Sequence, residues 1–139
     1  MSQNCVLEAE LCSLYAAAFE EARCHRWIES QKRWHDLGND GFLDWYDRFW
    51  WNFLRCRHLE HLLGESRWLE FSSEAFGVLA PFVESDDELA GEIIDQYRQG
   101  CENLDILNWA LRNCHCVEDV CECLVLINMN DARIDPRFN

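Results

Sequence analysis

The sequence predicts an all-α fold, a single compact bundle of five or six helices that takes in residues 1–139. Glycine and proline, the two residues least compatible with a helix interior, number only six and two. Apolar residues recur at three- and four-residue steps over long stretches, which is the period of one face of an α-helix. A chain of this length can bury a core without metal ions or disulfides.

The first predicted helix runs from about Gln3 into the low thirties. Its apolar residues share one helical face: Leu7, Leu11, Leu14, Ala18 and Ala22. His25 and Glu29 continue the same stripe toward the end of the helix. Two glycines and an asparagine in residues 36–41 then predict a loop.

The second predicted helix begins near Asp40 and ends at Gly64, because glycine commonly follows the last turn of a helix. Seven of the twelve residues from Phe42 to Phe53 are aromatic. Large rings bury roughly 150–250 Å² each, and these rings span a wide arc of the helix. We therefore expect this helix to be central and to form an antiparallel hairpin with the first.

Short elements are expected after the hairpin. Residues 68–71 are either extended or a helical linker. Ser72 or Ser73 is expected to cap a short helix that continues toward Leu79. Pro81 is expected to end or bend that helix, because proline has no backbone N–H to donate.

Three further helices complete the expected bundle. A capping box at residues 85–88 starts a helix that stops at Gly100. Asn103 is expected to cap the next one. The last helix covers residues 117–127, and the tail from Asp131 is expected to be irregular.

Acidic residues dominate the charge of the chain and concentrate in its second half. The formal net charge is −14, and residues 70–139 hold fifteen acidic residues against four arginines, a net charge of −11. Such a field repels phosphate backbones, so we expect no direct binding of nucleic acid. No long uncharged apolar stretch and no basic N-terminal segment are present, so we expect neither a membrane span nor a signal peptide, and a cytoplasmic location.

Nine cysteines in an unexported chain are expected to be mainly thiols, since an odd number cannot pair completely. Five are scattered singly and are expected to fill the core as small apolar residues: Cys5, Cys12, Cys24, Cys56 and Cys101. The other four gather around a histidine: Cys114, His115, Cys116, Cys121 and Cys123. Thiolates and imidazole bind zinc and iron, so this cluster is a candidate metal or redox site. The alternative is packing, because the spacing differs from that of structural zinc sites.

A second grouping of imidazoles and carboxylates resembles the ingredients of a metal site between bundle helices. Its members lie on the first two helices: Glu21, His25, Glu29, His58 and His61. The Glu-x-x-His element of di-iron bundles is missing, so hydrogen-bonded or solvated histidines are the alternative.

Arg57 and Glu60 project from the aromatic face of the second helix. A buried charge must be paired or reach solvent, and at this spacing the two can pair with each other. Arg57 can also lie against a ring. We therefore expect an internal clamp; the alternative is the polar floor of an aromatic ligand pocket. The same two alternatives, an internal clamp or part of a ligand pocket, apply to His25 and Glu29 on the first helix.

Three tryptophans fall away from the main apolar stripes: Trp27 and Trp34 on the first helix and Trp51 on the second. Trp27 and Trp34 are seven residues apart and nearly in register. They form either a second packing face against the C-terminal helices or an exposed patch for a partner.

The sequence contains no Gly-rich phosphate loop, no G-x-S-x-G elbow and no H-E-x-x-H, so no catalytic residue is predicted. We expect a small regulatory or interaction module that binds a protein partner or forms a homo-oligomer. The first alternative is a metal-binding or redox protein that uses the cysteine cluster. The second is an acidic mimic of nucleic acid, in which residues 84–105 present carboxylates to a basic protein.

Overall fold

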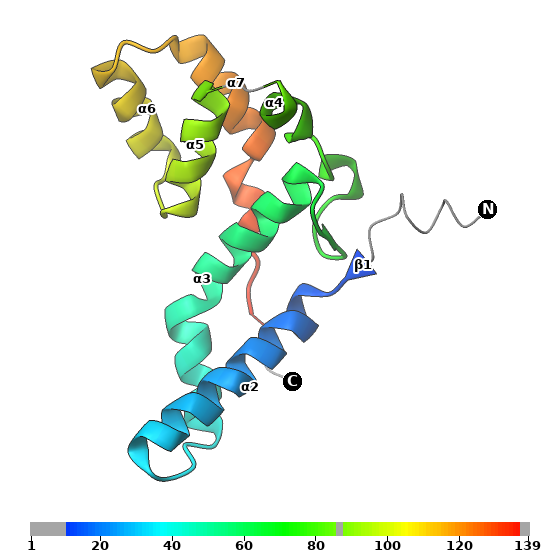
Figure 1. Ribbon diagram of the computed structural model, residues 1–139, viewed down its shortest axis with the longest axis vertical. Coiled ribbons are helices and arrows are strands. Elements are labelled where there is room, and N and C mark those ends of the chain that lie inside the picture. The colour runs from blue at the N-terminus through cyan, green and yellow to red at the C-terminus, as the bar shows by residue number, and fades with distance from the viewer. Residues whose placement is uncertain (1–10, 86–87, 137–139) are drawn as a thin grey trace, which may run out of the picture.

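The computed structural model describes residues 11–85 and 88–136, and this part of the chain is almost entirely helical (Figure 1). The helices are α2 (Leu14–Arg33), α3 (Asn39–Leu63), α4 (Ala80–Glu84), α5 (Glu88–Arg98), α6 (Asn103–Arg112) and α7 (Val117–Ile127). Two-residue strands β1 (Leu11–Cys12) and β2 (Arg67–Trp68) pair in parallel, and Ser73–Ala75 and Met129–Ala132 are 3₁₀ turns. The all-α prediction and the antiparallel hairpin of the first two helices are confirmed. No helix among the described residues is both long and apolar enough to cross a bilayer.

The first helix begins at Leu14, so the prediction that it starts near Gln3 is wrong for residues 11–13; residues 3–10 lie outside the described part. Residues Leu11–Cys12 are extended instead, and Ser13 is the N-cap of α2. Glu70 accepts a hydrogen bond from the Leu14 N–H at 2.7 Å. A carboxylate at a helix N-terminus is favourable, and this one comes from 56 residues later in the chain.

Two other helix ends differ from expectation. Pro81 lies in the first turn of α4, where the N–H that it lacks would have no helical partner, so it starts the helix and does not end it. Helix α6 is capped by Glu102, because Glu102 and Asp105 form a reciprocal capping box. Asn103 is therefore the first helical residue and not the cap. The capping box expected at residues 85–88 falls partly outside the described residues.

Two hydrophobic clusters share the long helix α3. The aromatic cluster lies between its first half and α2 and consists of Leu14, Ala18, Ala22, Trp45, Tyr46, Trp50, Phe53, Leu54, Trp68, Phe71 and Ala132. The aliphatic cluster lies between its second half and the C-terminal helices and consists of Leu59, Leu62, Leu79, Ala90, Ile93, Ile94, Tyr97, Ile106, Ala110, Val120, Cys123, Leu124, Ile127 and Met129. The hairpin and the C-terminal helices thus occupy opposite ends of the long axis (Figure 1).

Helix α2 buries a narrow strip because its inward residues are small. Ala18 and Ala22 are completely buried and let the rings of α3 lie close to the α2 backbone. Near the tip, a Cβ on Gly41 would lie 2.8 Å from Cγ of Arg26, so glycine is needed for this approach. The wider outer face of α2 is left to solvent.

The segment after α7 returns to the hairpin. The indole N–H of Trp50 donates to the carbonyl of Ile134 at 2.7 Å. The hydroxyl of Tyr15 donates to the carbonyl of Asp135 at 3.4 Å. The aromatic cluster is therefore completed by residues from the far end of the described chain.

Candidate interaction surface

All three off-stripe tryptophans lie on the surface. The exposed fractions are 65% for Trp27, 94% for Trp34 and 51% for Trp51. The C-terminal helices lie at the other end of the molecule, so they do not cover Trp27 and Trp34 (Figure 1). The sequence left open whether Trp27 and Trp34 pack against the C-terminal helices or lie exposed, and in the structure they are exposed.

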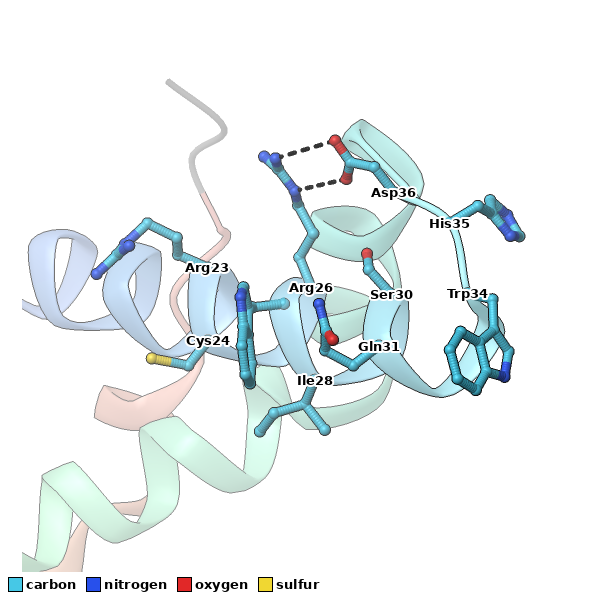
Figure 2. Close-up of a pocket in the computed structure, with 10 residues that line it drawn as sticks. Arg23, Cys24, Arg26, Ile28, Ser30, Gln31, Trp34, His35 and Asp36 are labelled. Atoms are coloured by element: carbon cyan, nitrogen blue, oxygen red, sulfur yellow. Dashed lines mark hydrogen bonds and ion pairs between the residues drawn. The ribbon is translucent and has the colours of Figure 1, made fainter.

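A hollow of about 790 Å³ lies on the outer face of α2 and the turn after it (Figure 2). Its apolar lining comes from Cys24, Trp27, Ile28 and Trp34, which we call the tryptophan patch. Ile28 is 47% exposed, and Cys24 is exposed as well, so the expectation that Cys24 fills the core is wrong. The sequence did carry a signal, because residues 24, 27 and 28 follow a helical spacing on a second face.

Trp34 leaves the helix in a way that increases its exposure. It is the C-cap of α2 and has a left-handed backbone, with φ of 61°. Its N–H bonds back to the carbonyls of the last turn, so the helix ends here. Figure 2 shows its indole beyond the last turn, at the edge of the hollow.

Basic side chains and one carboxylate, that of Asp36, border the tryptophan patch. Arg23, Arg26 and His35 line the hollow, and Arg26 pairs with Asp36 at 3.2 Å (Figure 2). Arg23 is paired as well, with Glu20 at 2.9 Å. Residues 20–36 hold four basic and four acidic residues, so this end of the hairpin is close to neutral in a chain of −14.

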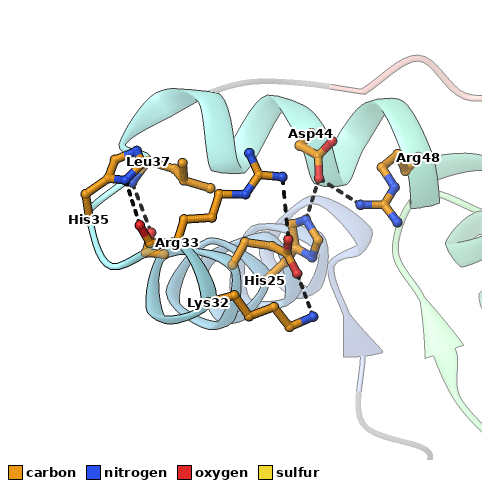
Figure 3. Close-up of polar contacts among 9 residues, drawn as sticks. His25, Lys32, Arg33, His35, Leu37, Asp44 and Arg48 are labelled. Atoms are coloured by element: carbon orange, nitrogen blue, oxygen red, sulfur yellow. Dashed lines mark hydrogen bonds and ion pairs between the residues drawn. The ribbon is translucent and has the colours of Figure 1, made fainter.

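Lys32 and Arg33 share one carboxylate, that of Glu29, at 3.1 and 4.0 Å (Figure 3). The hydrogen bond from Lys32 holds the pKa of Glu29 below its usual value, in spite of partial desolvation. The Glu29 side chain is largely covered, whereas both cations are exposed. This group of ion pairs lies outside the lining of the hollow.

His25 joins α2 to α3. Its Nε2 lies 2.7 Å from Oδ2 of Asp44, which also accepts a hydrogen bond from Arg48 at 3.2 Å (Figure 3). The hydrogen bonds from His25 and Arg48 hold the pKa of Asp44 below its usual range. The imidazole also meets the ring of Phe49 edge-on. These contacts fix the two helices next to the patch.

A second, shallower hollow of about 510 Å³ lies between α2 and α3. Its apolar floor is made by rings of α3: Trp45, Phe49 and Phe53. Cys24 and Ile28 line both hollows, so the patch and this groove form one continuous surface. A partner side chain that entered the groove would meet aromatic rings.

Arg57 lines the groove and pairs with Glu60 at 3.2 Å. Its guanidinium lies over Phe53 and Trp68, at 5.4 and 5.9 Å from the ring centres. The ion pair and the ring contact expected from the sequence are both present. Nε of Arg57 is buried and has no hydrogen-bond partner within the described residues.

His58 and His61 lie in the interior. Nδ1 of His58 is 3.0 Å from the hydroxyl of Tyr97, and burial, with a smaller effect of His61, lowers the pKa of His58 to about 4. His61 accepts a hydrogen bond from the Trp68 N–H at 3.1 Å and donates to the Ser72 carbonyl at 2.7 Å. Both nitrogens of His61 are thus engaged by the backbone.

The cysteine cluster is divided between surface and core. Cys114, Cys116 and Cys121 are exposed, whereas Cys123 lies in the aliphatic cluster. His115 stacks on Trp109, with ring centres 4.6 Å apart. Over residues 11–85 and 88–136, no group of three or more His, Cys, Asp and Glu side chains is placed to hold a metal ion. The zinc or iron hypothesis stays a prediction.

Trp51 lies apart from the tryptophan patch. It lines a small hollow with Arg55, Glu102 and Arg133. Glu102 pairs there with both arginines, so its carboxylate links α3, α6 and the segment after α7. Trp51 is thus an exposed tryptophan in a different setting.

Comparisons with protein families, curated proteins and solved structures found no match to this chain. The tryptophan patch holds two exposed tryptophans and an exposed isoleucine around one hollow, and it adjoins a groove.

Proposed function

We propose that this protein is a protein-interaction module whose binding surface is the tryptophan patch with the adjoining groove. The observation that carries the proposal is the joint exposure of Trp27, Ile28 and Trp34 around one hollow. Clustered exposed apolar side chains mark interaction sites, and tryptophan is enriched among the residues that dominate binding energy.

The shape of this surface favours an amphipathic helix as the bound element. An apolar side chain of such a helix fits the groove floored by Phe49 and Phe53. Glu20, Glu21 and Arg57 line the same groove, so charged side chains of both signs border its apolar floor. Partner residues of opposite sign can pair with them, which selects partners.

Binding and folding can be separated at this surface. Trp27 and Trp34 lie outside both hydrophobic clusters, so their removal leaves the cores intact. Trp27 is exposed within the helix, and exposed substitutions away from caps and cores change stability by within about 0.5 kcal/mol. Trp34 is the C-cap, but the capping bond comes from its backbone N–H, which serine keeps. A loss of binding with unchanged helicity would therefore be a direct effect on the surface.

Selection of short helical peptides from a display library against the full chain tests the proposal. Enriched peptides should be amphipathic, and Trp27→Ser with Trp34→Ser should weaken their binding by about tenfold or more. Circular dichroism checks that helicity is retained. The matched control is Trp51→Ser, which removes an exposed tryptophan elsewhere and should leave the affinity unchanged. Peptides that bind the double variant as tightly as the original chain would refute the proposal, as would a failure to enrich any.

A further inference from the structure

The charges that line the tryptophan patch and the adjoining groove are balanced in number, but one of them is unpaired. Three carboxylates and three arginines line the two hollows: Glu20, Glu21, Asp36, Arg23, Arg26 and Arg57. Each arginine pairs with a carboxylate of this chain, at 2.9 Å for Arg23 and at 3.2 Å for both Arg26 and Arg57. The positive charges of the lining are therefore already met within the chain.

Glu21 is the exception among these charged side chains. Within the described residues its carboxylate makes no ion pair or hydrogen bond, and its side chain is exposed where it lines the groove. Glu21, Cys24 and Ile28 are three and four residues apart, so they share one face of α2. A free carboxylate thus borders the apolar side chains that belong to both hollows.

The rings that floor the groove also attract cations. The guanidinium of Arg48 lies 4.9 Å from the ring centre of Phe49, and that of Arg57 lies 5.4 Å from that of Phe53. The face of an aromatic ring carries partial negative charge, which explains both contacts. A partner's lysine or arginine suits such a groove, because its apolar stem packs on rings while its charge reaches a carboxylate at the edge.

The net charge of the whole chain favours the same sign of partner. A chain of −14 attracts basic molecules and repels acidic ones, which include a second copy of itself. An acidic partner would also find each arginine of the lining already paired. The unpaired carboxylate and the overall field therefore both favour a cationic partner.

We propose that the partner of this surface is a basic amphipathic helix. Its apolar side chains cover Trp27, Ile28 and Trp34, and a lysine or arginine enters the groove and pairs with Glu21. The inference rests on the proposed function, that the patch and groove bind an amphipathic helix, and it adds the sign of the charge that this helix carries.

Two model peptides test the charge preference by isothermal titration calorimetry with the full chain. Both are amphipathic helices with the same leucine and tryptophan positions, and the polar face carries lysine in one and glutamate in the other. The lysine peptide should bind about tenfold more tightly or better, because charge-assisted hydrogen bonds are the stronger ones. Its affinity should fall as salt is added, since salt screens exposed charges. Glu21→Lys should weaken the lysine peptide by about tenfold.

The matched control is Glu92→Lys, which makes the same change of net charge at an exposed position of α5 outside both hollows. It should change the affinity by less than about twofold, because distant exposed charges are screened. Equal weakening by Glu21→Lys and Glu92→Lys would show that total charge governs binding and would overturn the proposal. Tighter binding of the glutamate peptide would overturn it too, as would binding of neither peptide.

The peptide selection described above separates a failure of this inference from a failure of the proposed function. Enriched peptides without a surplus of basic residues, whose binding still depends on Trp27 and Trp34, would keep the interaction surface and overturn its preference for a basic helix. Sedimentation of the chain alone tests the remaining occupant. A dimer that Trp27→Ser with Trp34→Ser dissociates would place a second copy on the patch and overturn the basic helix.

Discussion

The aromatic and the aliphatic cluster use the same helix, α3, in different ways. In the aromatic cluster, rings pack on rings, such as Trp45 on Tyr46 and Phe53 with centres 5.0 and 5.5 Å apart, and α2 supplies small residues against them. In the aliphatic cluster, branched side chains from α3, α5, α6 and α7 meet in the middle. Each aromatic ring buries a large surface area, so two helices and short flanking segments are enough to enclose a core. No helix of the described residues covers the outer face of α2, and the tryptophans there are exposed.

The largest difference between the two clusters should appear when one buried side chain of each is truncated. Trp50 is buried among rings and donates to the Ile134 carbonyl, so Trp50→Ala should lower the free energy of unfolding by about 4–5 kcal/mol. Ile93→Ala in the aliphatic cluster should cost about 3 kcal/mol, because it loses fewer contacts and no hydrogen bond. Urea unfolding followed by circular dichroism measures both.

Trp51→Ala is the neighbouring control, and since Trp51 is half exposed its cost should stay below about 1 kcal/mol. Equal costs for Trp50→Ala and Ile93→Ala would mean that the rings give the hairpin no special stability.

His58 connects the two clusters and makes their junction sensitive to acid. Its imidazole packs on Phe71 of the aromatic cluster and lies at hydrogen-bonding distance from Tyr97 of the aliphatic cluster. The pKa of His58 is about 4 in the fold against 6.5 unfolded, so the unfolded chain binds the proton first as pH falls. The contribution of neutral His58 to the free energy of unfolding should be fully present above pH 6.5. It should fall by up to about 3 kcal/mol as the pH drops to 4.

Urea unfolding at neutral pH and near pH 4.5 checks this expectation. His58→Gln should be less stable at neutral pH but should lose less on acidification than the original chain. His35→Gln, at an exposed histidine, should keep the full acid sensitivity. An unchanged acid loss in His58→Gln would show that other groups cause it.

Replacing glycine by alanine at two positions, one in each half of the molecule, should change stability by smaller amounts and in opposite directions. A Cβ on Gly41 would lie 2.8 and 2.9 Å from side-chain carbons of Arg26, so Gly41→Ala should destabilise the hairpin by about 1–2 kcal/mol. At Gly91 in α5 nothing lies within 4 Å of an added Cβ, so Gly91→Ala should stabilise by about 0.5–1 kcal/mol. Thermal unfolding measures both, and shifts of the same sign would contradict the close approach of α2 and α3 at the tip.

Local signals in the sequence sufficed for most of the helices. The ring-rich periodicity and Gly64 define α3, because glycine at φ of 78° caps it as expected. The start of α2 is later than predicted, because Leu11 and Cys12 pair with Arg67 and Trp68, which are remote in sequence. Ser13 is the local N-cap, and the remote Glu70 accepts from the Leu14 N–H. The Glu102 cap of α6 competes with an equally plausible Asn103, and only the backbone geometry distinguishes them.

The sequence predicts on which face of the helix the tryptophans of the candidate site lie, but it does not predict whether that face is exposed. Periodicity places Trp27 and Trp34 away from the main stripe, but whether another helix covers them depends on where the C-terminal helices pack. The burial of His58 and His61 was missed for the same reason. Their partners, Tyr97 and Ser72, lie on other segments of the chain.

The return of the chain to Trp50 also has a consequence for protein synthesis. Ile134 follows Trp50 by 84 residues, so a ribosome working at about 5–20 residues per second supplies it roughly 4–17 seconds later. During that interval the newly made hairpin lacks a hydrogen-bond acceptor for its central indole. The rings of the hairpin are then incompletely covered in the nascent chain, and chaperones that bind exposed aromatic segments have access to them.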